Sequence, residues 1–373
     1  MTQPSLSEKS SLSENSDLFD ANLAKAVLEQ CRALSSDPSL AYKFTSRFNT
    51  VAVITDGSNA PSLGDIGPLA SLPLVEQKAR LLNQTAQINT LPLVLDSQSL
   101  EDTVRTVKSL ALSLGAINLE AVNETASMEI KRRLEEIEEV PVLHDNLDAL
   151  PVLCLAALLN ALKVVNKKMN AVKIVLASPE SEALSMVDFF RLAGVTDIIV
   201  CDKTGAIHPS RPGHTNWVKE ELALKTNPRQ IKGPLAKVAV DSDVLIVISS
   251  AVPINKDLVS TMAPQAIIFN LTETTKDNFF GAAVTAGKSD LNSNLLSPYL
   301  VVPGLLRGSL DARARVINAP MKMAAALAIS KLVPEADLGP SFIIPSVSKH
   351  NLVSVLAEAV STAAAASGVS RLI

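Results

Sequence analysis

VKIVLASPESEALSMVDFFRLAGVTDIIVCD, residues 172–202, is the stretch that decides the fold. Its opening run, VKIVLAS, and its closing run, DIIVCD, are short and apolar, and each predicts a buried strand. The segment between them is amphipathic and predicts a helix. A strand, a helix and a second strand within about 30 residues are typical of the first unit of a nucleotide-binding fold with a parallel sheet.

The same alternation continues toward the N-terminus. The runs TVAVITDG (50–57), LPLVLD (91–96) and GAINLE (115–120) are strand-like. Residues 99–112 and 124–139 have the spacing of helices. Strands that alternate with helices favour a mostly parallel sheet, so we predict an α/β protein.

Further elements follow on the C-terminal side. The segment ALPVLCLAALLNALKVV (149–165) is apolar on nearly all sides and predicts a buried helix that joins two halves of the chain. DVLIVISS (243–250) and AIIFNL (266–271) predict more strands of the second half. The Ala-rich segments 321–333 and 352–368 predict helices that cover one face of the structure.

This organisation predicts three parts: a disordered leader over residues 1–20, an N-terminal α/β domain over 21–163, and a Rossmann-like domain with C-terminal helices over 164–373. The helix that begins near residue 20 should pack on a core, because its apolar residues share one face. These residues are Leu23, Val27, Leu28, Cys31 and Leu34.

Composition excludes several classes of protein. In 373 residues, 47% are hydrophobic and 19% charged, and charged or polar residues interrupt every apolar run before it reaches the roughly 20 residues of a membrane span. A net charge of -4 without a clustered basic face argues against nucleic acid. Cys31, Cys154 and Cys201 lie far apart, which favours reduced thiols and a cytoplasmic location.

The loop after the first strand of the 172–202 unit lacks what a dinucleotide needs. Such loops read GxGxxG so that the backbone can approach the pyrophosphate, whereas this one reads ASPESEA, with Ser178, Glu180 and Ala183 at the degenerate positions. We expect Ser178 to cap the helix, Pro179 to take its first position and Glu180 to repel a diphosphate. A register shift of one residue is the alternative. Asp202 stands where such folds bind ribose, although it also suits a turn.

Several motifs occur together over most of the chain, from about residue 23 to the end. They are VAVITDG, LGDIGPLA, VEQKA, INLE, PVLHD, LLNALK, DIIVCDKTGAI, GKSD and PGLLRGSLDARARVIN. In this order they resemble the NAD(P)-dependent malic enzymes, particularly the compact bacterial type. The resemblance implies a two-domain fold with a doubly wound, Rossmann-like second domain. It also implies oxidative decarboxylation of malate with NAD(P) and a divalent metal, in a dimer or larger assembly.

Of the family's general acid and general base, this chain retains only the base. The family's general acid is the Tyr of a YTPG motif, and Leu23 stands at that position. Leu cannot transfer a proton. The general-base lysine falls on Lys78, which is retained. The family's ANPDP and VNN motifs are replaced at 272–275 and 296–298, so nicotinamide and substrate contacts are lost there.

The metal ligands implied by the resemblance are only partly retained. The family's NLED motif keeps Glu120 but has Ala121 in place of the Asp, and its HDDQHGT motif keeps Asp145 but has Asn146 as the second Asp. Magnesium and manganese need several oxygen ligands with enough negative charge, so we expect weak metal binding. Asp148 could compensate only if the start of the following helix is reshaped.

Taken together, these losses favour a malic-enzyme fold that serves as a catalytically inactive scaffold or interaction subunit, a homodimer or a partner of another protein. No cofactor is expected in that case, and NAD(P) with magnesium or manganese only if the family activity survives. Two alternatives stay open: an active or altered NAD(P)-dependent malic enzyme, and a sensor that binds an organic acid through Lys78 and Arg307.

Overall fold

The computed structural model describes the backbone of residues 21–97, 99–136, 139–211, 216–248, 254–272, 281–288 and 294–371. Contacts divide the chain into two compact units, residues 1–48 and 49–373. The first unit contains four helical segments in its described part. These are α1 (Ala21–Ser36), η3 (Pro38–Leu40), α2 (Ala41–Phe44) and the start of η4 (Ser46–Asn49).

The helix predicted near residue 20 is present as α1, but its predicted packing is wrong. Val27 and Leu28 are 48% and 56% exposed, and Cys31 is exposed as well. The spacing of these apolar residues specifies a helix with one apolar face. Within the first unit, no described segment covers that face, and the spacing alone does not reveal this.

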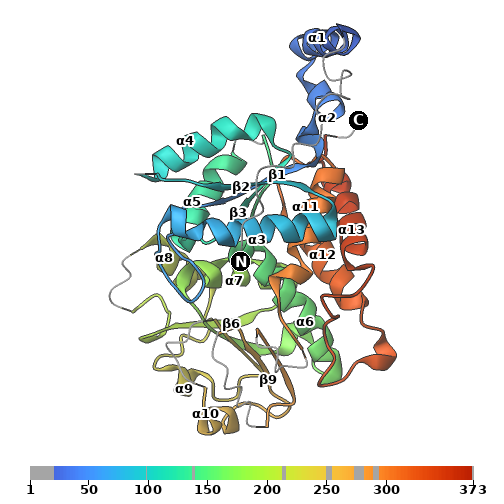
Figure 1. Cartoon of the computed structure of the whole chain (residues 1–373). Coiled ribbons are helices and arrows are strands. Elements are labelled where there is room, and N and C mark those ends of the chain that lie inside the picture. Colours follow the sequence, from blue (N-terminus) through green and yellow to red (C-terminus); the bar gives the residue numbers. More distant parts are fainter. Residues whose placement is uncertain are drawn as a thin grey trace, which may run out of the picture. The chain divides into compact units, whose positions relative to one another are not determined.

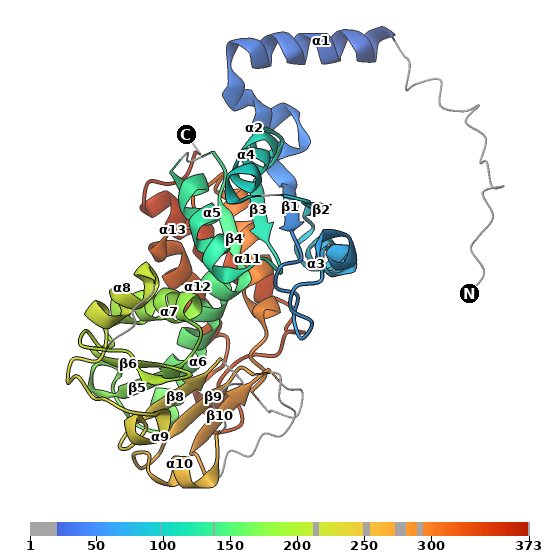
Figure 2. The same cartoon turned by 90° about the vertical axis from the view of Figure 1, so that its left-hand side faces the viewer.

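The second unit contains two sheets, of which the first is fully parallel with the strand order β2-β1-β3-β4. Its strands are β1 (Thr50–Thr55), β2 (Asn89–Val94), β3 (Ala116–Leu119) and β4 (Val142–His144). Its helices are α3 (Pro68–Ala86), α4 (Leu100–Leu110) and α5 (Glu124–Glu135), with η5 (Ala111–Ser113) after α4. Figure 2 shows α3 and α5 on opposite sides of this sheet.

Alternate residues of β1 explain why the strand is apolar throughout. Val51 and Val53 belong to one hydrophobic core together with Val75 of α3. Ala52 and Ile54 belong to another core that includes residues of α4 and α5. Because both faces are covered, the strand has no solvent side on which polar residues would alternate.

The second sheet has the order β10-β9-β8-β5-β6-β7, parallel except for β7. Its strands are β5 (Lys173–Ala177), β6 (Asp197–Asp202), β7 (Gly205–Ala206), β8 (Val244–Val247), β9 (Ile267–Asn270) and β10 (Val284–Gly287). The helical segments along it are η7 (Met169–Ala171), α7 (Glu180–Leu192), α8 (Trp217–Lys225), α9 (Leu235–Val238) and α10 (Lys256–Ser260). The predicted strand-helix-strand unit is therefore β5-α7-β6. Strands β6 and β7 lie on one side of β5, and the chain then crosses to β8 on the other side of β5. In such folds ligands bind at the carboxyl ends of the strands beside this crossover.

The apolar helix predicted between the halves is α6 (Leu150–Val164), preceded by a π turn, η6 (Asp145–Ala149). The stretch Asp145–Val164 is long and apolar enough by composition to cross a membrane, and 83% of its apolar window is buried inside the structure. That burial is typical of a core helix. The domain boundary that we place near Lys163 stays a prediction.

The C-terminal part is helical, as the Ala-rich segments predict. It consists of η8 (Pro298–Leu300), α11 (Val302–Asp311), α12 (Ala319–Lys331), η9 (Glu335–Asp337) and α13 (Leu352–Ala366). Figure 1 shows α11, α12 and α13 packed side by side. The contact between α11 and α13 is close, because a Cβ atom at Gly308 would lie 2.6 Å from the carbonyl oxygen of Ala357.

Candidate functional site

A buried lysine and two carboxylates meet at the carboxyl edge of the first sheet. Strands β3 and β4 are parallel neighbours with Leu119 paired to His144, so Glu120 and Asp145 leave the sheet at the same edge. Lys78 on α3 forms ion pairs with both carboxylates. Its side chain is 4% exposed, and those of Glu120 and Asp145 are 18% and 15% exposed. The structure thus brings together the three residues that the resemblance assigns to the base and metal positions.

The electrostatics of this cluster keep Lys78 positively charged. Burial alone would lower the pKa of Lys78, but the charges and hydrogen bonds of Asp145 and Glu120 outweigh burial and raise it above its ordinary value of 10.5. Burial and the neighbouring Asp145 raise the pKa of Glu120, and Lys78 opposes that shift. The side-chain amide of Asn118 donates to Asp145 at 3.0 Å and fixes its orientation.

The residues present do not fit a magnesium or manganese ion. Ala121 has a φ of +51°, in the left-handed region that Asp and Asn tolerate better than Ala, and its methyl side chain offers no oxygen ligand. Asn146 lines the same pocket and offers an amide without charge. The carboxylates of Glu120 and Asp145 are both engaged by Lys78. Within the described ranges, no group of three or more His, Cys, Asp or Glu residues is arranged to hold a metal.

A pocket of about 240 Å³ opens at this cluster. Its lining comprises Asn59, Pro61, Lys78, Leu119, Glu120, Ala121, Val122, His144, Asp145, Asn146, Lys288, Pro298 and Tyr299. Sequence reasoning missed Tyr299, whose ring centre lies 5.8 Å from the Nζ atom of Lys78. Burial raises the pKa of Tyr299, and Lys78 opposes that shift. A single tyrosine beside a replaced motif has no spacing that would identify it.

The π turn η6 begins the helix after Asp145 and depends on two side chains. The Nδ1 atom of His144 accepts from the backbone N–H groups of Asn146 and Leu147 at 3.2 and 3.4 Å. Asp148 accepts from the backbone N–H of His144 at 2.9 Å. Asp148 forms its ion pairs with lysines of α5 and α12 and does not line the pocket of Lys78, so it is not placed to compensate for the carboxylates missing at positions 121 and 146.

The N-cap of α7, in the loop after β5, is not the residue that the sequence predicts. Pro179 is the N-cap of α7, and Ser178 is not. The physical reason is that Ser178 still belongs to the sheet edge, because its N–H donates to Cys201 at 3.2 Å and its hydroxyl donates to the carbonyl of Pro179 at 2.9 Å. Ala183 is fully buried in the core. The side chain of Glu180 lies outside the described residues, so its predicted repulsion of a diphosphate stays a prediction.

Asp202 ends β6, as the strand pattern predicts, and its carboxylate is engaged by its own chain. It accepts from Arg211 at 2.9 and 2.7 Å and from the N–H and hydroxyl of Thr204 at 2.8 and 2.9 Å. Burial alone would raise the pKa of Asp202, but these hydrogen bonds lower it. Lys219 lies 3.5 Å away. The carboxylate of Asp202 thus stabilises the turn that follows β6, which is the role expected of an Asp in a turn.

Arg307 is not brought to the Lys78 pocket. The role given to Leu23 stays a prediction, because Leu23 lies in α1 of the first unit and its side chain is outside the described residues. Arg307 donates to Asp311 at 2.9 Å and to Asn49, and it is not among the described residues that line the pocket. The pairing of Lys78 with Arg307 that a sensor would use is therefore not present in this pocket. Residues 273–275 lie outside the described ranges.

Sequence and structure comparisons both find similarity to malic enzymes. Residues 31–105 match the family model described as malic enzyme, N-terminal domain. The chain is 38% identical over 351 residues to an NAD-dependent malic enzyme of Geobacillus stearothermophilus, covering 92% of this chain and 73% of that protein. A bifunctional malic/malolactic enzyme of Bacillus subtilis is 36% identical to this chain, and the match covers 93% of this chain and 86% of that enzyme. The crystal structure of a malic enzyme from Pyrococcus horikoshii is similar with a TM-score of 0.91 and 31% identity, covering 100% of this chain and 88% of that one.

Replacing Lys78 by Met leaves the carboxylates of Glu120 and Asp145 without their cation. We expect the free energy of unfolding at pH 7 to fall by about 3 kcal/mol, because breaking a buried ion pair leaves uncompensated charge. Urea denaturation measures the loss, which should shrink in acid as the two carboxyl groups become protonated. In the unaltered protein, the raised pKa of Lys78 gives stability that is fully present below pH 10.5 and is lost only as the pH rises through that raised pKa.

Lys163→Met is the matched control for this prediction. Lys163 pairs with Glu335 at 2.9 Å, but the two side chains are 53% and 83% exposed. Exposed pairs contribute about 0–1 kcal/mol. If Lys78→Met and Lys163→Met have equal effects at pH 7, the cluster does not stabilise the fold.

Proposed function

Because the chain belongs to the malic enzyme family, we propose that it is a catalytically inactive member, a scaffold or interaction subunit that does not oxidise malate. One observation carries this proposal: Lys78 is bound between Glu120 and Asp145, beside an alanine at position 121 where the family's motif has a metal ligand. Without the ion, nothing polarises the substrate oxygen, and without a neutral lysine nothing accepts the proton.

The nucleotide end of the second sheet supports the same proposal. The loop at Ser178 has no glycine to admit a pyrophosphate, and Ser178 itself is 2% exposed. Asp202, which would accept hydrogen bonds from a ribose, already accepts them from Arg211 and Thr204. Binding NAD(P) would require both sites to release their present contacts.

An active enzyme is the second candidate. Relatives named as NAD- and NADP-dependent malic enzymes share 31–38% identity with this chain, and Lys78, Glu120 and Asp145 still lie together. Under this alternative, the chain would use NAD(P) and a divalent metal, with Asn146 supplying a neutral ligand in place of a carboxylate.

A turnover assay separates the two candidates. Purified protein is incubated with malate, manganese and either NAD or NADP, and the reduced nucleotide is followed by absorbance. We expect no formation above the rate without protein, and the Geobacillus relative assayed in parallel serves as the positive control. Turnover near the roughly 10 s⁻¹ that is ordinary for enzymes would refute the inactive assignment.

The interaction role is supported by α1. Val27 and Leu28, 48% and 56% exposed, share one face of this helix with the exposed Cys31. Burying such residues is favourable by about 25 cal/mol for each Å² of apolar surface. The occupant that we assign to this face is a second copy of the chain, in keeping with the dimer that the family resemblance implies.

Leu28→Glu tests this assignment by adding a charge to the exposed face of α1. Sedimentation velocity of the full chain should show a dimer for the unaltered protein and a monomer for Leu28→Glu, since a buried unpaired charge opposes association. Leu112→Glu is the matched control, because Leu112 is 68% exposed in η5 and should leave the dimer intact. A monomer for the unaltered protein, or a dimer for Leu28→Glu, would contradict the assignment.

A further inference from the structure

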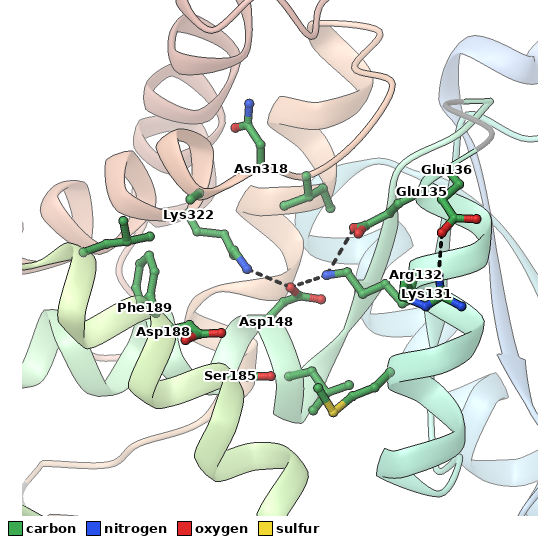
Figure 3. Close-up of a pocket in the computed structure, with 15 residues that line it drawn as sticks. Lys131, Arg132, Glu135, Glu136, Asp148, Ser185, Asp188, Phe189, Asn318 and Lys322 are labelled. Atoms are coloured by element: carbon green, nitrogen blue, oxygen red, sulfur yellow. Dashed lines mark hydrogen bonds and ion pairs between the residues drawn. The ribbon is translucent and has the colours of Figure 1, made fainter. Parts of the chain in front are cut away.

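A second cavity, of about 640 Å³, lies apart from the Lys78 pocket and shares none of its lining residues. Its walls come from α5, from η6, from α7 and from the start of α12 (Figure 3). Figure 3 shows charged side chains of α5 and α12 directed toward Asp148 at the centre. Neither the family resemblance nor the proposed function assigns a role to this cavity.

Four charged side chains form a row of alternating sign along the cavity. The Oδ1 atom of Asp148 lies 3.2 Å from the Nζ atom of Lys322 and also pairs with Lys131. Lys131 in turn lies 3.5 Å from Glu135. The inner members, Asp148 and Lys131, are 1% and 12% exposed and satisfy one another.

The outer members of the row have spare capacity. Lys322 is 21% exposed and Glu135 is 31% exposed, and each forms one ion pair within the part of the chain that the structure describes. An ammonium has three donors and a carboxylate has about four acceptor sites, so both ends can bind a further group. The cavity therefore presents a positive end and a negative end.

The remaining lining suits an apolar group between these ends. Met128, Leu147, Phe189, Leu192 and Ile317 contribute apolar surface. The other charged residues of the lining are already engaged: Arg132 pairs with Glu136 at 2.6 Å, and Asp188 pairs with Lys225 at 2.7 Å. A ligand with several negative charges would meet the acidic side chains of the lining without matching cations.

We propose that this cavity binds a zwitterionic α-amino acid with an apolar side chain, its carboxylate toward Lys322, its ammonium toward Glu135 and its side chain against the apolar wall. A volume of about 640 Å³ is within the range of small-molecule pockets. The inference does not depend on the loss of catalysis at Lys78. It places a ligand beside the turn that carries Asp145, because Asp148 accepts from the N–H of His144 at 2.9 Å.

Calorimetric titration with three matched compounds tests the proposal on the full chain. L-leucine carries both charges, 4-methylpentanoate lacks the ammonium and 3-methylbutylamine lacks the carboxylate. We expect leucine to bind with a dissociation constant at least about tenfold below those of the other two, since a hydrogen bond to a charged group is typically a tenfold effect or more. No binding of leucine, or equal binding of leucine and 4-methylpentanoate, would overturn the proposal.

Two variants assign the binding to this cavity. Glu135→Gln should weaken leucine binding at least about tenfold and leave any binding of 4-methylpentanoate unchanged, because only the ammonium partner is altered. Glu101→Gln is the matched control, since Glu101 is 74% exposed, pairs with Arg133 and does not line the cavity. Denaturation midpoints of both variants establish that they are folded. Leucine binding that is unaffected by Glu135→Gln would exclude this site.

Discussion

The ammonium of Lys78 lies between the carboxylates of Glu120 and Asp145, and this contact joins α3 to the carboxyl edge of the first sheet. Two adjacent parallel strands release their carboxylates at one edge, where they would repel each other without a cation. Helix α3 supplies the cation from a position that is 4% exposed. The same contact that holds this edge together also raises the pKa of Lys78 and keeps its ammonium charged.

Three turns near the carboxyl edges of the two sheets hold residues to which the resemblance assigns a role. Ala121 keeps a left-handed φ of +51° that disfavours alanine by roughly 1–2 kcal/mol. His144 caps the π turn that carries Asp145 and Asn146. Asp202 is bound by Arg211 at the edge where a ribose would lie. The core patterns and turns are preserved while groups that would meet metal and cofactor are replaced or occupied.

Local pattern predicted much of the fold. The strands near 50–57 and 115–120 and the helices α6 and α13 follow from apolar spacing, because β1, β3 and most residues of α6 are buried. The three-residue strand β4 and the helix α11 were not predicted, since a strand so short has no period and α11 contains two glycines. The exposure of α1 depends on what covers it, which spacing does not specify.

The candidate site was predictable only where a motif marks it. Lys78, Glu120 and Asp145 were found through the resemblance, although 42 and 67 positions separate the lysine from its partners. Tyr299 and the contacts of Asp148 were not predicted. Asp148 pairs with Lys131 and Lys322, which lie 17 and 174 positions away in the sequence, and such separations leave no local pattern. The cap at Ser178 was wrong because hydrogen bonds to the sheet edge compete with capping.

Manganese binding can be measured by calorimetry on the unaltered chain and on a double variant, Ala121→Asp with Asn146→Asp, that supplies both carboxylates of the family's motifs. We expect no saturable binding to the unaltered chain at millimolar manganese and clear binding to the double variant, because the ion then has enough negative ligands to displace Lys78. Ala121→Asn with Asn146 unchanged controls for side-chain size without charge. Binding to the unaltered chain as tight as to the double variant would show that the residues present do hold a metal ion.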